Sequence, residues 1–305
     1  MKIAITGGTG FVGSRLVEKL AAAGHEMIVF SRDRLKAQQV FPPDRFPTVE
    51  IVEYTAKFAG PWQQKLSGCD GVVNLAGAPI ADERWTAARK QELQSSRIQG
   101  TAQLVAGIAQ ATVKPQVLIN ASAIGYYGTS ETARFTETSP AGRDFLASIC
   151  VGWEREAQKV KVSGVRLVIL RLGIVLGNGG AIARMIPPFK LFAGGPIGSG
   201  KQWFSWIHRE DVVNVILKAL EDPQMAGVYN ATAPHPLRMG EFCRVMGQVM
   251  NRPSWLPVPN FVIDALLGDG AIVVLEGQQV IPQGLLDLGF EYEYAEAKEA
   301  IAEIV

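Results

Sequence analysis

The stretch ITGGTGFVG, residues Ile5–Gly13, joins a short apolar segment to three spaced glycines near the start of the chain. This pattern predicts a strand that ends at Thr6, a tight turn, and a helix that begins close to Gly13. Gly7 permits the turn, Gly10 lets a diphosphate approach the backbone, and Gly13 lets the helix pack closely on the strand. The helix N-terminus adds amide donors and a positive dipole end. The stretch therefore predicts a dinucleotide-binding turn in an α/β fold.

Short apolar segments alternate with helical patterns over the first two-thirds of the chain. The expected strands are Lys2–Thr6, Glu26–Phe30, Val49–Glu53, Gly71–Leu75, Gln116–Ala121, Arg166–Leu170 and Gly227–Ala231. The expected helices are Gly13–Ala23, Arg84–Ala111, Phe145–Val162, Arg209–Glu221, Gly240–Met250 and Ala295–Ile304. Apolar strands that alternate with helices predict a doubly wound, Rossmann-type parallel sheet covered on both faces. Three prolines in Arg252–Pro259 indicate a connector into a smaller C-terminal lobe, and the glycine-rich segment Gly173–Gly200 is expected to form loops near a cleft.

Composition excludes several classes of protein. Lysine and arginine total 30 against 29 acidic residues, so no global basic field points to nucleic acid. The cysteines Cys69, Cys150 and Cys243 are far apart and predict reduced thiols, with neither a disulfide frame nor a metal site. Charged residues interrupt the longest apolar runs, so we expect no membrane insertion, and the chain lacks a signal-peptide pattern at its N-terminus. We expect a cytoplasmic protein.

The end of the second expected strand bears on the choice of cofactor. A site for NAD needs a carboxylate there to accept from the ribose hydroxyls, whereas this chain has Ser31 followed by Arg32, with Arg34 and Lys36 nearby. A guanidinium matches the extra 2′-phosphate of NADP(H), so NADP(H) is favoured. Asp33 keeps the NAD alternative open, because a shift of one residue would make it the ribose carboxylate.

Several ordered segments resemble the extended branch of the short-chain dehydrogenase/reductase superfamily over nearly the whole chain. They are Gly7–Gly13, Val72–Gly77, Arg97–Thr101 with Arg97 in place of an asparagine, Asn120–Gly128, and Trp206–Asp211. More narrowly, further segments are similar to an epimerase-like subfamily labelled nucleoside-diphosphate-sugar epimerase. These are Arg171–Gly177, Gly198–Trp203, Leu256–Pro259 and Gly277–Val280, of which the last belongs to a short C-terminal domain of unknown function.

The resemblance implies a division of the chain and a set of cofactor-binding residues. Residues 1–172 and 208–235 would form the NADP-binding Rossmann domain, and residues 173–207 and 236–305 the smaller substrate lobe. The implied cofactor-binding residues are Gly7, Thr9, Gly10, Phe11, Val12, Gly13, Ser31, Arg32, Leu75, Ala76, Gly77, Ala121, Ser122, Leu172, Gly173 and Ile174.

The catalytic pair of the superfamily is missing. Active members place a tyrosine, and a lysine four residues later, on the helix after the serine strand; here those positions fall on Ile149 and Trp153. Isoleucine has no ionisable proton and an indole N–H carries no charge, so ordinary keto–hydroxyl chemistry is in doubt. Cys150 is one position away and would point about 100° around the helix. Ser122 and Tyr127 are the remaining catalytic candidates, with strand-end capping and packing as their respective alternatives.

Other residues have both a functional and a structural interpretation. Glu137 could act as a base or stabilise a turn, and Tyr126 could border the cleft or shape a loop. His208 could form an acid–base pair with Asp211 or cap the following helix, and Asp211 suits the first turn of a helix. The tryptophans that flank Ser205, Trp203 and Trp206, could stack on a sugar or a base or simply pack in a core.

Two functions remain open. The first is an NADP(H)-dependent oxidoreductase or epimerase acting on a small carbonyl or sugar-nucleotide substrate. The second is a non-catalytic NADP(H)-sensing regulator or scaffold, and the resemblance to relatives linked with plastid or cell division is compatible with it. The resemblance also allows a homodimer, while the substrate itself is not identified.

Overall fold

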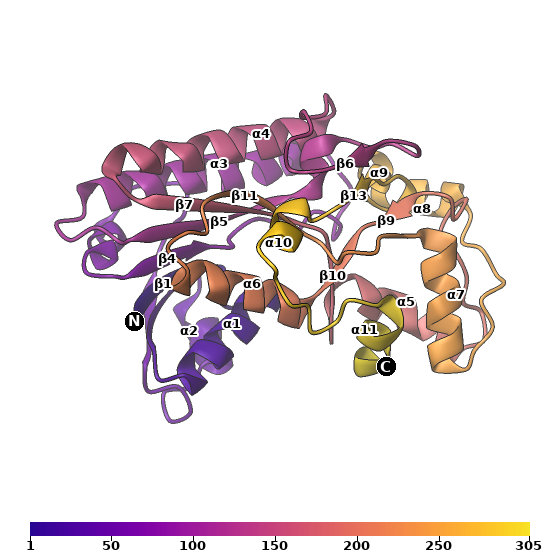
Figure 1. Cartoon of the computed structure of the whole chain (residues 1–305), viewed down its shortest axis with the longest axis horizontal. Coiled ribbons are helices and arrows are strands. Elements are labelled where there is room, and N and C mark those ends of the chain that lie inside the picture. The colour runs from indigo at the N-terminus through magenta and orange to yellow at the C-terminus, as the bar shows by residue number, and fades with distance from the viewer.

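A seven-stranded parallel sheet forms the centre of the computed structural model, which describes residues 1–305 (Figure 1). The strands lie in the order β3-β2-β1-β4-β5-β7-β11, and every neighbouring pair is parallel. Their bounds are β1 (Lys2–Thr6), β2 (Glu26–Ser31), β3 (Val49–Glu53), β4 (Gly71–Asn74), β5 (Val117–Ala123), β7 (Arg166–Leu172) and β11 (Gly227–Ala231). All seven segments predicted as strands are in this sheet, so the doubly wound Rossmann-type fold is confirmed.

Helices cover both faces of the sheet, as the alternating pattern predicted. On one face lie α3 (Ala87–Gln110) and α4 (Phe145–Gln158), and on the other lie α1 (Phe11–Ala22) and α6 (Arg209–Glu221) (Figure 1). The helix α2 (Arg34–Val40), next to β2, was not predicted. Because successive side chains of a strand point to opposite faces, Ile3 and Ile5 pack with α1 and α6 while Ala4 packs in the core under α3.

The remaining elements are short and gather mainly at the C-terminal side. The strands are β6 (Arg134–Phe135), β8 (Ile174–Leu176), β9 (Trp203–Phe204), β10 (Trp206–His208), β12 (Leu237–Arg238) and β13 (Gln279–Val280). The helices are α5 (Gly180–Lys190), α7 (Met239–Met250), α8 (Asn260–Leu267), α9 (Ile272–Leu275), α10 (Gln283–Asp287) and α11 (Ala297–Ile304), and the 3-10 turns are η1 (Pro61–Leu66), η2 (Ile124–Tyr127), η3 (Lys159–Ser163) and η4 (Gly268–Ala271). The division into two domains with the boundaries given above stays a prediction.

The expectation that Gly173–Gly200 forms loops is wrong for two parts of this segment. This segment contains β8 and the helix α5, which buries Ile182 and Phe189 in the core of the C-terminal side. Pro187 and Pro188 lie inside α5. Each proline removes a backbone donor, so their presence argued against a helix, yet burial of the apolar face stabilises it.

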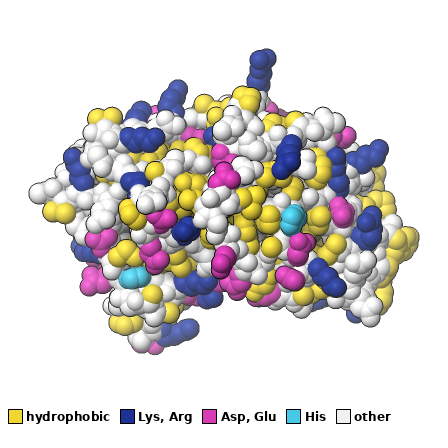
Figure 2. All heavy atoms as spheres, in the orientation of Figure 1, with side chains coloured by type: hydrophobic (Ala, Val, Ile, Leu, Met, Phe, Trp, Pro, Cys, Tyr) yellow, Lys and Arg dark blue, Asp and Glu magenta, His cyan; other side chains and the backbone are white.

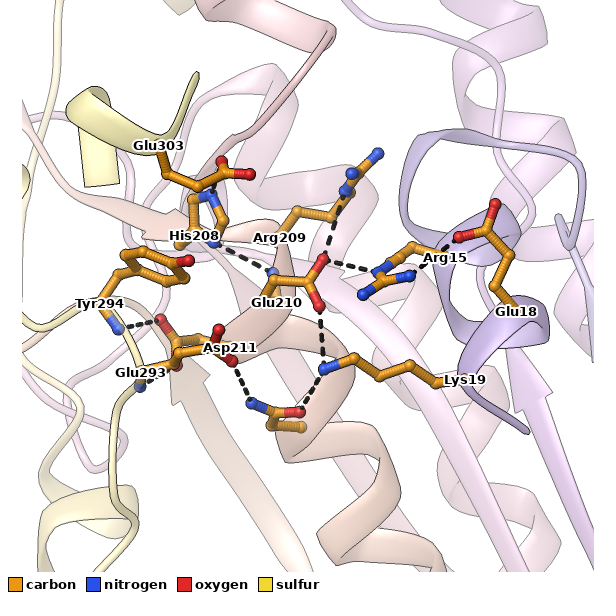
Figure 3. A network of polar contacts seen from close by, with 11 residues as sticks. Arg15, Glu18, Lys19, His208, Arg209, Glu210, Asp211, Glu293, Tyr294 and Glu303 are labelled. Atoms are coloured by element: carbon orange, nitrogen blue, oxygen red, sulfur yellow. Dashed lines mark hydrogen bonds and ion pairs between the residues drawn. The ribbon is translucent and has the colours of Figure 1, made fainter. Parts of the chain in front are cut away.

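A network of polar contacts fixes the C-terminal tail to the start of α6 (Figure 3). The Asp211 carboxylate accepts from the backbone N–H groups of Glu293 and Tyr294 at 2.7 and 3.1 Å. His208 Nδ1 accepts from the Glu210 N–H at 3.3 Å, so the histidine caps α6, and its Nε2 lies 3.1 Å from Glu303 of α11. An acid–base pair between His208 and Asp211 is therefore not formed, and the capping alternative is confirmed.

The same network reaches the helix of the glycine-rich turn. Arg15 and Lys19 of α1 contact the two carboxylate oxygens of Glu210 at 2.7 and 2.9 Å (Figure 3). These cations lower the pKa of Glu210 to about 2 although the carboxyl group is partly buried. The first turn of α6 thus connects α1 with the C-terminal tail.

The surface has no dominant charge on the face that Figure 2 shows, where acidic and basic side chains are interspersed. This agrees with the formal net charge of +1. None of the helices combines the length and the hydropathy that crossing a bilayer requires.

Candidate functional site

The turn between β1 and α1 has the geometry that the glycines predicted. Gly7 adopts a φ of +70°, which favours glycine, and an added Cβ there would lie 2.8 Å from the Leu75 carbonyl carbon. A Cβ on Gly13 would lie 2.2 Å from the Gly7 carbonyl oxygen, so α1 packs against the turn more closely than any other residue allows. Gly10 caps α1 without a side-chain hydrogen bond. The first amides of the helix are therefore left for an anion.

A cavity of about 510 Å³ begins at this turn and extends past the carboxyl ends of β4, β5 and β7 to the C-terminal side. Twelve of the residues predicted to bind a cofactor line it: Gly7, Gly10, Phe11, Val12, Gly13, Leu75, Gly77, Ala121, Ser122, Leu172, Gly173 and Ile174. Thr9, Ala76, Ser31 and Arg32 lie outside its lining. Ligands of open α/β sheets bind at this edge of the strands, so the cavity is the candidate active site.

Asp33, the residue that kept the NAD alternative open, has a structural role. Its Oδ1 accepts from the Lys36 N–H at 3.0 Å and caps α2. Ser31 Oγ donates to the Asp33 carbonyl oxygen at 3.0 Å and so fixes the end of β2. The exposed side chain of Arg32 has no ion pair with another residue. Of these residues, the arginine is the one free to contact a 2′-phosphate.

Ser122 belongs to a buried polar network. Its Oγ donates to Glu154 Oε1 at 2.7 Å, and Arg171 donates to both carboxylate oxygens of Glu154 at 2.8 and 2.9 Å. Ser122 is thus held by α4 and β7 while it lines the cavity from the end of β5. Its single hydroxyl proton is directed at Glu154, which leaves the oxygen lone pairs for a ligand.

Tyr127, the other catalytic candidate, does not line the cavity. Its hydroxyl donates to Asn230 Oδ1 at 2.6 Å and accepts from Arg171 at 2.9 Å. Burial raises the pKa of Tyr127 to about 12. The neighbouring Tyr126 ring lies under the Arg171 guanidinium, with 3.4 Å between its centroid and the guanidinium carbon. The structure therefore places both tyrosines in packing positions around Arg171, which favours their structural interpretation.

The helix α4 presents to the cavity the positions where the superfamily has its tyrosine and lysine. Ile149, Cys150 and Trp153 all line the cavity from this helix. Burial raises the pKa of the Cys150 thiol to about 11, so it stays protonated at neutral pH. The indole Nε1 of Trp153 is buried and has no hydrogen-bond partner in the chain.

Arg97 is the lining residue that sequence reasoning noted only as a departure from a motif. It lies on the buried face of α3 with Leu93, Thr101 and Leu104, at helical spacing. A charged residue in a run of otherwise buried positions was the signal that could have identified it. No other lysine or arginine lines the cavity.

The remaining candidates divide between the cavity and the core. Trp203 lines the cavity and is covered by Arg238, whose guanidinium carbon lies 3.9 Å from the ring centroid. Trp206 is fully buried. Glu137 Oε1 accepts from the backbone N–H groups of Asn230 and Gly284 at 2.9 and 3.1 Å, so it joins β11 to α10 away from the cavity lining.

Comparison with known proteins identifies the family. Residues 3–232 match the NAD dependent epimerase/dehydratase family, and residues 258–304 match a domain of unknown function, DUF1731. The chain is 49% identical to an epimerase family protein SDR39U1 homolog, chloroplastic, of Arabidopsis thaliana, over 100% of this chain and 87% of the relative. It is 39% identical to the epimerase family protein YfhF of Bacillus subtilis, over 100% and 98%.

Solved structures agree with this assignment. The human epimerase family protein SDR39U1, crystallised with NADPH, superposes with a TM-score of 0.87 at 35% identity, over 100% of this chain and 99% of that one. A UDP-glucuronic acid 4-epimerase from Bacillus cereus in complex with NAD has a TM-score of 0.78 at 17% identity, over 99% and 95%, and shares the fold. The chain belongs to the NAD dependent epimerase/dehydratase family, and its last part is a DUF1731 domain.

Proposed function

We propose that this member of the epimerase/dehydratase family is an NADP(H)-dependent oxidoreductase that acts on a small, largely apolar carbonyl compound. The observation that carries the proposal is the continuous cavity, which begins at the glycine turn, passes Ser122 and ends against apolar side chains of the C-terminal side. One end of the cavity suits a dinucleotide and the other a small organic molecule.

The residues present fit NADP(H). The turn at Gly7 and Gly13 leaves no room for side chains, so a diphosphate can approach the amides at the start of α1. Arg32 lies free at the end of β2, and a guanidinium pairs with a phosphate through two hydrogen bonds. The crystallisation of a 35% identical relative with NADPH supports the same choice.

The lining at the far end of the cavity favours an apolar substrate. Outside the glycine turn the lining includes the apolar residues Ile80, Ile124, Leu146, Ile272 and Val273, and its acids are Asp144 and Glu276. A sugar nucleotide carries a diphosphate of its own, which proteins bind with several cations or helix amides. Arg97 is the single cation of the lining, so the cavity suits a neutral molecule or one with a single negative group more than a second diphosphate.

The chemistry follows from the groups on the cavity wall. The reduced cofactor, when bound, supplies a hydride. Ser122 is held near the reacting atoms by Glu154, and we propose that its hydroxyl rotates away from Glu154 to donate to the carbonyl oxygen of the substrate. Hydride transfer to the carbonyl carbon then gives an alkoxide, which takes its proton from solvent as the alcohol leaves the cavity. The apolar side chains of Ile149 and the C-terminal side exclude water from the reacting atoms. Neither Ile149 nor Trp153 can transfer a proton as the tyrosine and lysine of the superfamily do.

A regulator that binds NADP(H) without turnover is the second candidate. The replacement of both ionisable residues at Ile149 and Trp153 favours it, as does the commitment of the Ser122 proton to Glu154. In this case cofactor binding would act through the C-terminal side, whose residues Ile272–Gln278 include several that line the same cavity.

Two measurements on the purified chain separate the candidates. Calorimetric titration with NADPH and NADH tests cofactor binding, and we expect tighter binding of NADPH. The decay of NADPH absorbance is then followed with aldehydes, ketones and sugar nucleotides, and we expect oxidation with an apolar aldehyde or ketone. Binding without any oxidation would reject the oxidoreductase and leave the regulator. Absence of binding to either coenzyme would reject both.

A further inference from the structure

Arg97 is a buried cation without an acidic partner. Its side chain on α3 is 8% exposed, and it donates to the backbone carbonyl oxygens of Ala78 at 2.9 Å and Leu93 at 3.1 Å. No carboxylate forms an ion pair with it, whereas Arg171, which is also buried, has the carboxylate of Glu154. Buried charges in proteins are normally paired, because removal from water costs more than two neutral hydrogen bonds return.

The surroundings of Arg97 make its positive charge harder to retain. Burial is the main cause that lowers the pKa of Arg97 to about 10, and the positive charge of Arg89 on the same helix lowers it further. The guanidinium remains charged at neutral pH. A charge kept in such a place at a cost to stability is typical of a functional site.

Close packing holds the Arg97 guanidinium in the cavity wall. A Cβ on Gly77 would lie 3.0 Å from the guanidinium carbon, so a larger residue at that position would meet the arginine. On another side the guanidinium carbon lies 5.3 Å from the ring centroid of Trp153. Both Arg97 and Trp153 line the cavity that begins at the glycine turn.

Trp153 adds a second donor without a partner. Its side chain is 5% exposed, and its indole N–H makes no hydrogen bond within the chain. A buried donor of this kind is rare in native proteins unless a ligand satisfies it. A cation without an acidic partner and an unpaired donor beside it in one cavity wall favour an acceptor with negative charge.

We propose that Arg97 and Trp153 together bind an oxyanionic group of a ligand in the cavity. The group is either a phosphate of the dinucleotide or a carboxylate of the substrate, since both offer oxygen acceptors to a guanidinium and an N–H donor. The inference rests on the proposed function for the cofactor, but it concerns binding and does not need turnover. In this arrangement the positive charge near Trp153 comes from α3, because α4 has no cation at this position.

Binding measurements on four variants test the inference. Arg97→Met removes the charge at similar length, Arg97→Lys keeps the charge, and Trp153→Phe removes the N–H with the ring retained. Arg89→Met is the matched control, since Arg89 lies on the same helix but does not line the cavity. Dissociation constants for NADPH and NADH are measured by calorimetry, and thermal unfolding without ligand shows that each variant is folded.

The two sources of the oxyanion give different results. If the dinucleotide supplies it, Arg97→Met weakens NADPH and NADH by the same factor, about 10-fold to 100-fold, because the diphosphate is common to both. If the substrate supplies it, Arg97→Met leaves coenzyme binding unchanged, and the NADP-loaded protein loses its preference for hexanoate over hexanamide, the two probes used. Arg97→Lys keeps the charge, so we expect a smaller loss than with Arg97→Met in either case. It is the variant to measure if Arg97→Met does not fold.

One result overturns the inference. If Arg97→Met and Trp153→Phe change no affinity for NADPH, NADH or hexanoate by more than Arg89→Met does, Arg97 is a structural cation. Failure of the wild-type protein to oxidise NADPH would reject the oxidoreductase and leave these binding results valid, so the two proposals fail separately.

Discussion

Trp153 and Glu154 are neighbours on α4, but only the polar group of Glu154 has hydrogen-bond partners within the chain. Glu154 lies among groups that satisfy one another: it accepts from Nε and Nη2 of Arg171 and from the hydroxyl of Ser122. Trp153 lies against a guanidinium without an acid, and its own N–H has no partner. Both side chains are about equally buried. Burial therefore does not distinguish polar groups that maintain the fold from those that bind a ligand, but hydrogen-bond satisfaction does.

The difference also separates the effects expected from mutation. Removing a partner from the satisfied network around Glu154 leaves a buried charge alone, so the cost appears in the stability of the protein. Removing the indole N–H of Trp153 from the cavity wall deletes no hydrogen bond that the chain itself makes. Its cost appears in ligand binding.

The largest expected effect comes from the hydrogen-bonded network around Glu154. Replacing Glu154→Gln leaves the Arg171 guanidinium buried without a negative charge, so we expect a loss of about 3–5 kcal/mol in the free energy of unfolding. Chemical denaturation measures it, with Ser122→Ala as the control that removes one hydrogen bond to the carboxylate and costs about 1.5–3 kcal/mol. Equal stability of Glu154→Gln and wild type would contradict the assignment of this network to the fold.

The next effect concerns Arg32, an exposed cation without an ion-pair partner that follows β2 and lies outside the cavity lining. Replacing Arg32→Asp removes the contact to the 2′-phosphate and adds repulsion, so NADPH binding should weaken roughly 10-fold to 100-fold while NADH binding does not. The ratio of the two dissociation constants measures the change. Equal losses for both coenzymes would show that Arg32 does not contact the 2′-phosphate.

A smaller effect is expected from Trp153→Phe. The variant loses one neutral N–H donor and keeps the ring under Arg97, so ligand affinity should fall by about 1 kcal/mol with little change in the unfolding temperature. Calorimetry and thermal unfolding on the same sample measure both quantities. A lower unfolding temperature with unchanged affinity would show that the Trp153 N–H stabilises the fold and does not bind the ligand.

The smallest effect concerns His208, a satisfied group that titrates. Burial lowers the pKa of His208 below its usual 6.5, so the unfolded chain binds a proton more readily than the folded one. Stability from this residue is present above pH 6.5 and falls as the pH drops from 6.5 towards the folded-state pKa. Against His208→Asn, which retains a capping side chain, the wild type should lose relative stability over this range. A difference independent of pH would contradict a neutral buried His208.

The regular part of the molecule could be predicted from the sequence because its signals are local. Most of the seven strands are short, mainly apolar runs, and β3 alternates apolar and acidic residues. The glycines of the first turn have a spacing and context that few structures other than a dinucleotide site require. Twelve of the predicted cofactor residues line one cavity for the same reason, since the ends of parallel strands meet at one edge.

The missed features depend on partners distant in the sequence. The bond from Ser122 to Glu154 joins residues 32 positions apart, and the role of Asp33 as a cap required the short helix α2, which has few apolar residues. The helix α5 was not predicted because Pro187 and Pro188 lie inside it, and proline disfavours helix interiors. The absence of an acidic partner for Arg97 depends on where each carboxylate lies in the folded chain, which sequence patterns do not show.

The two ends of the cavity are formed by different parts of the chain, which evolution can change separately. The dinucleotide end comes from the turn at Gly7–Gly13 and the strand ends, whereas Ile272, Val273 and Glu276–Gln278 from the C-terminal domain close the opposite end. A mutant library restricted to residues 272–278 would sample new acceptor molecules without disturbing the coenzyme half. Relatives with the same first half and a different closing segment should thus differ in what they accept more than in what they use as reductant.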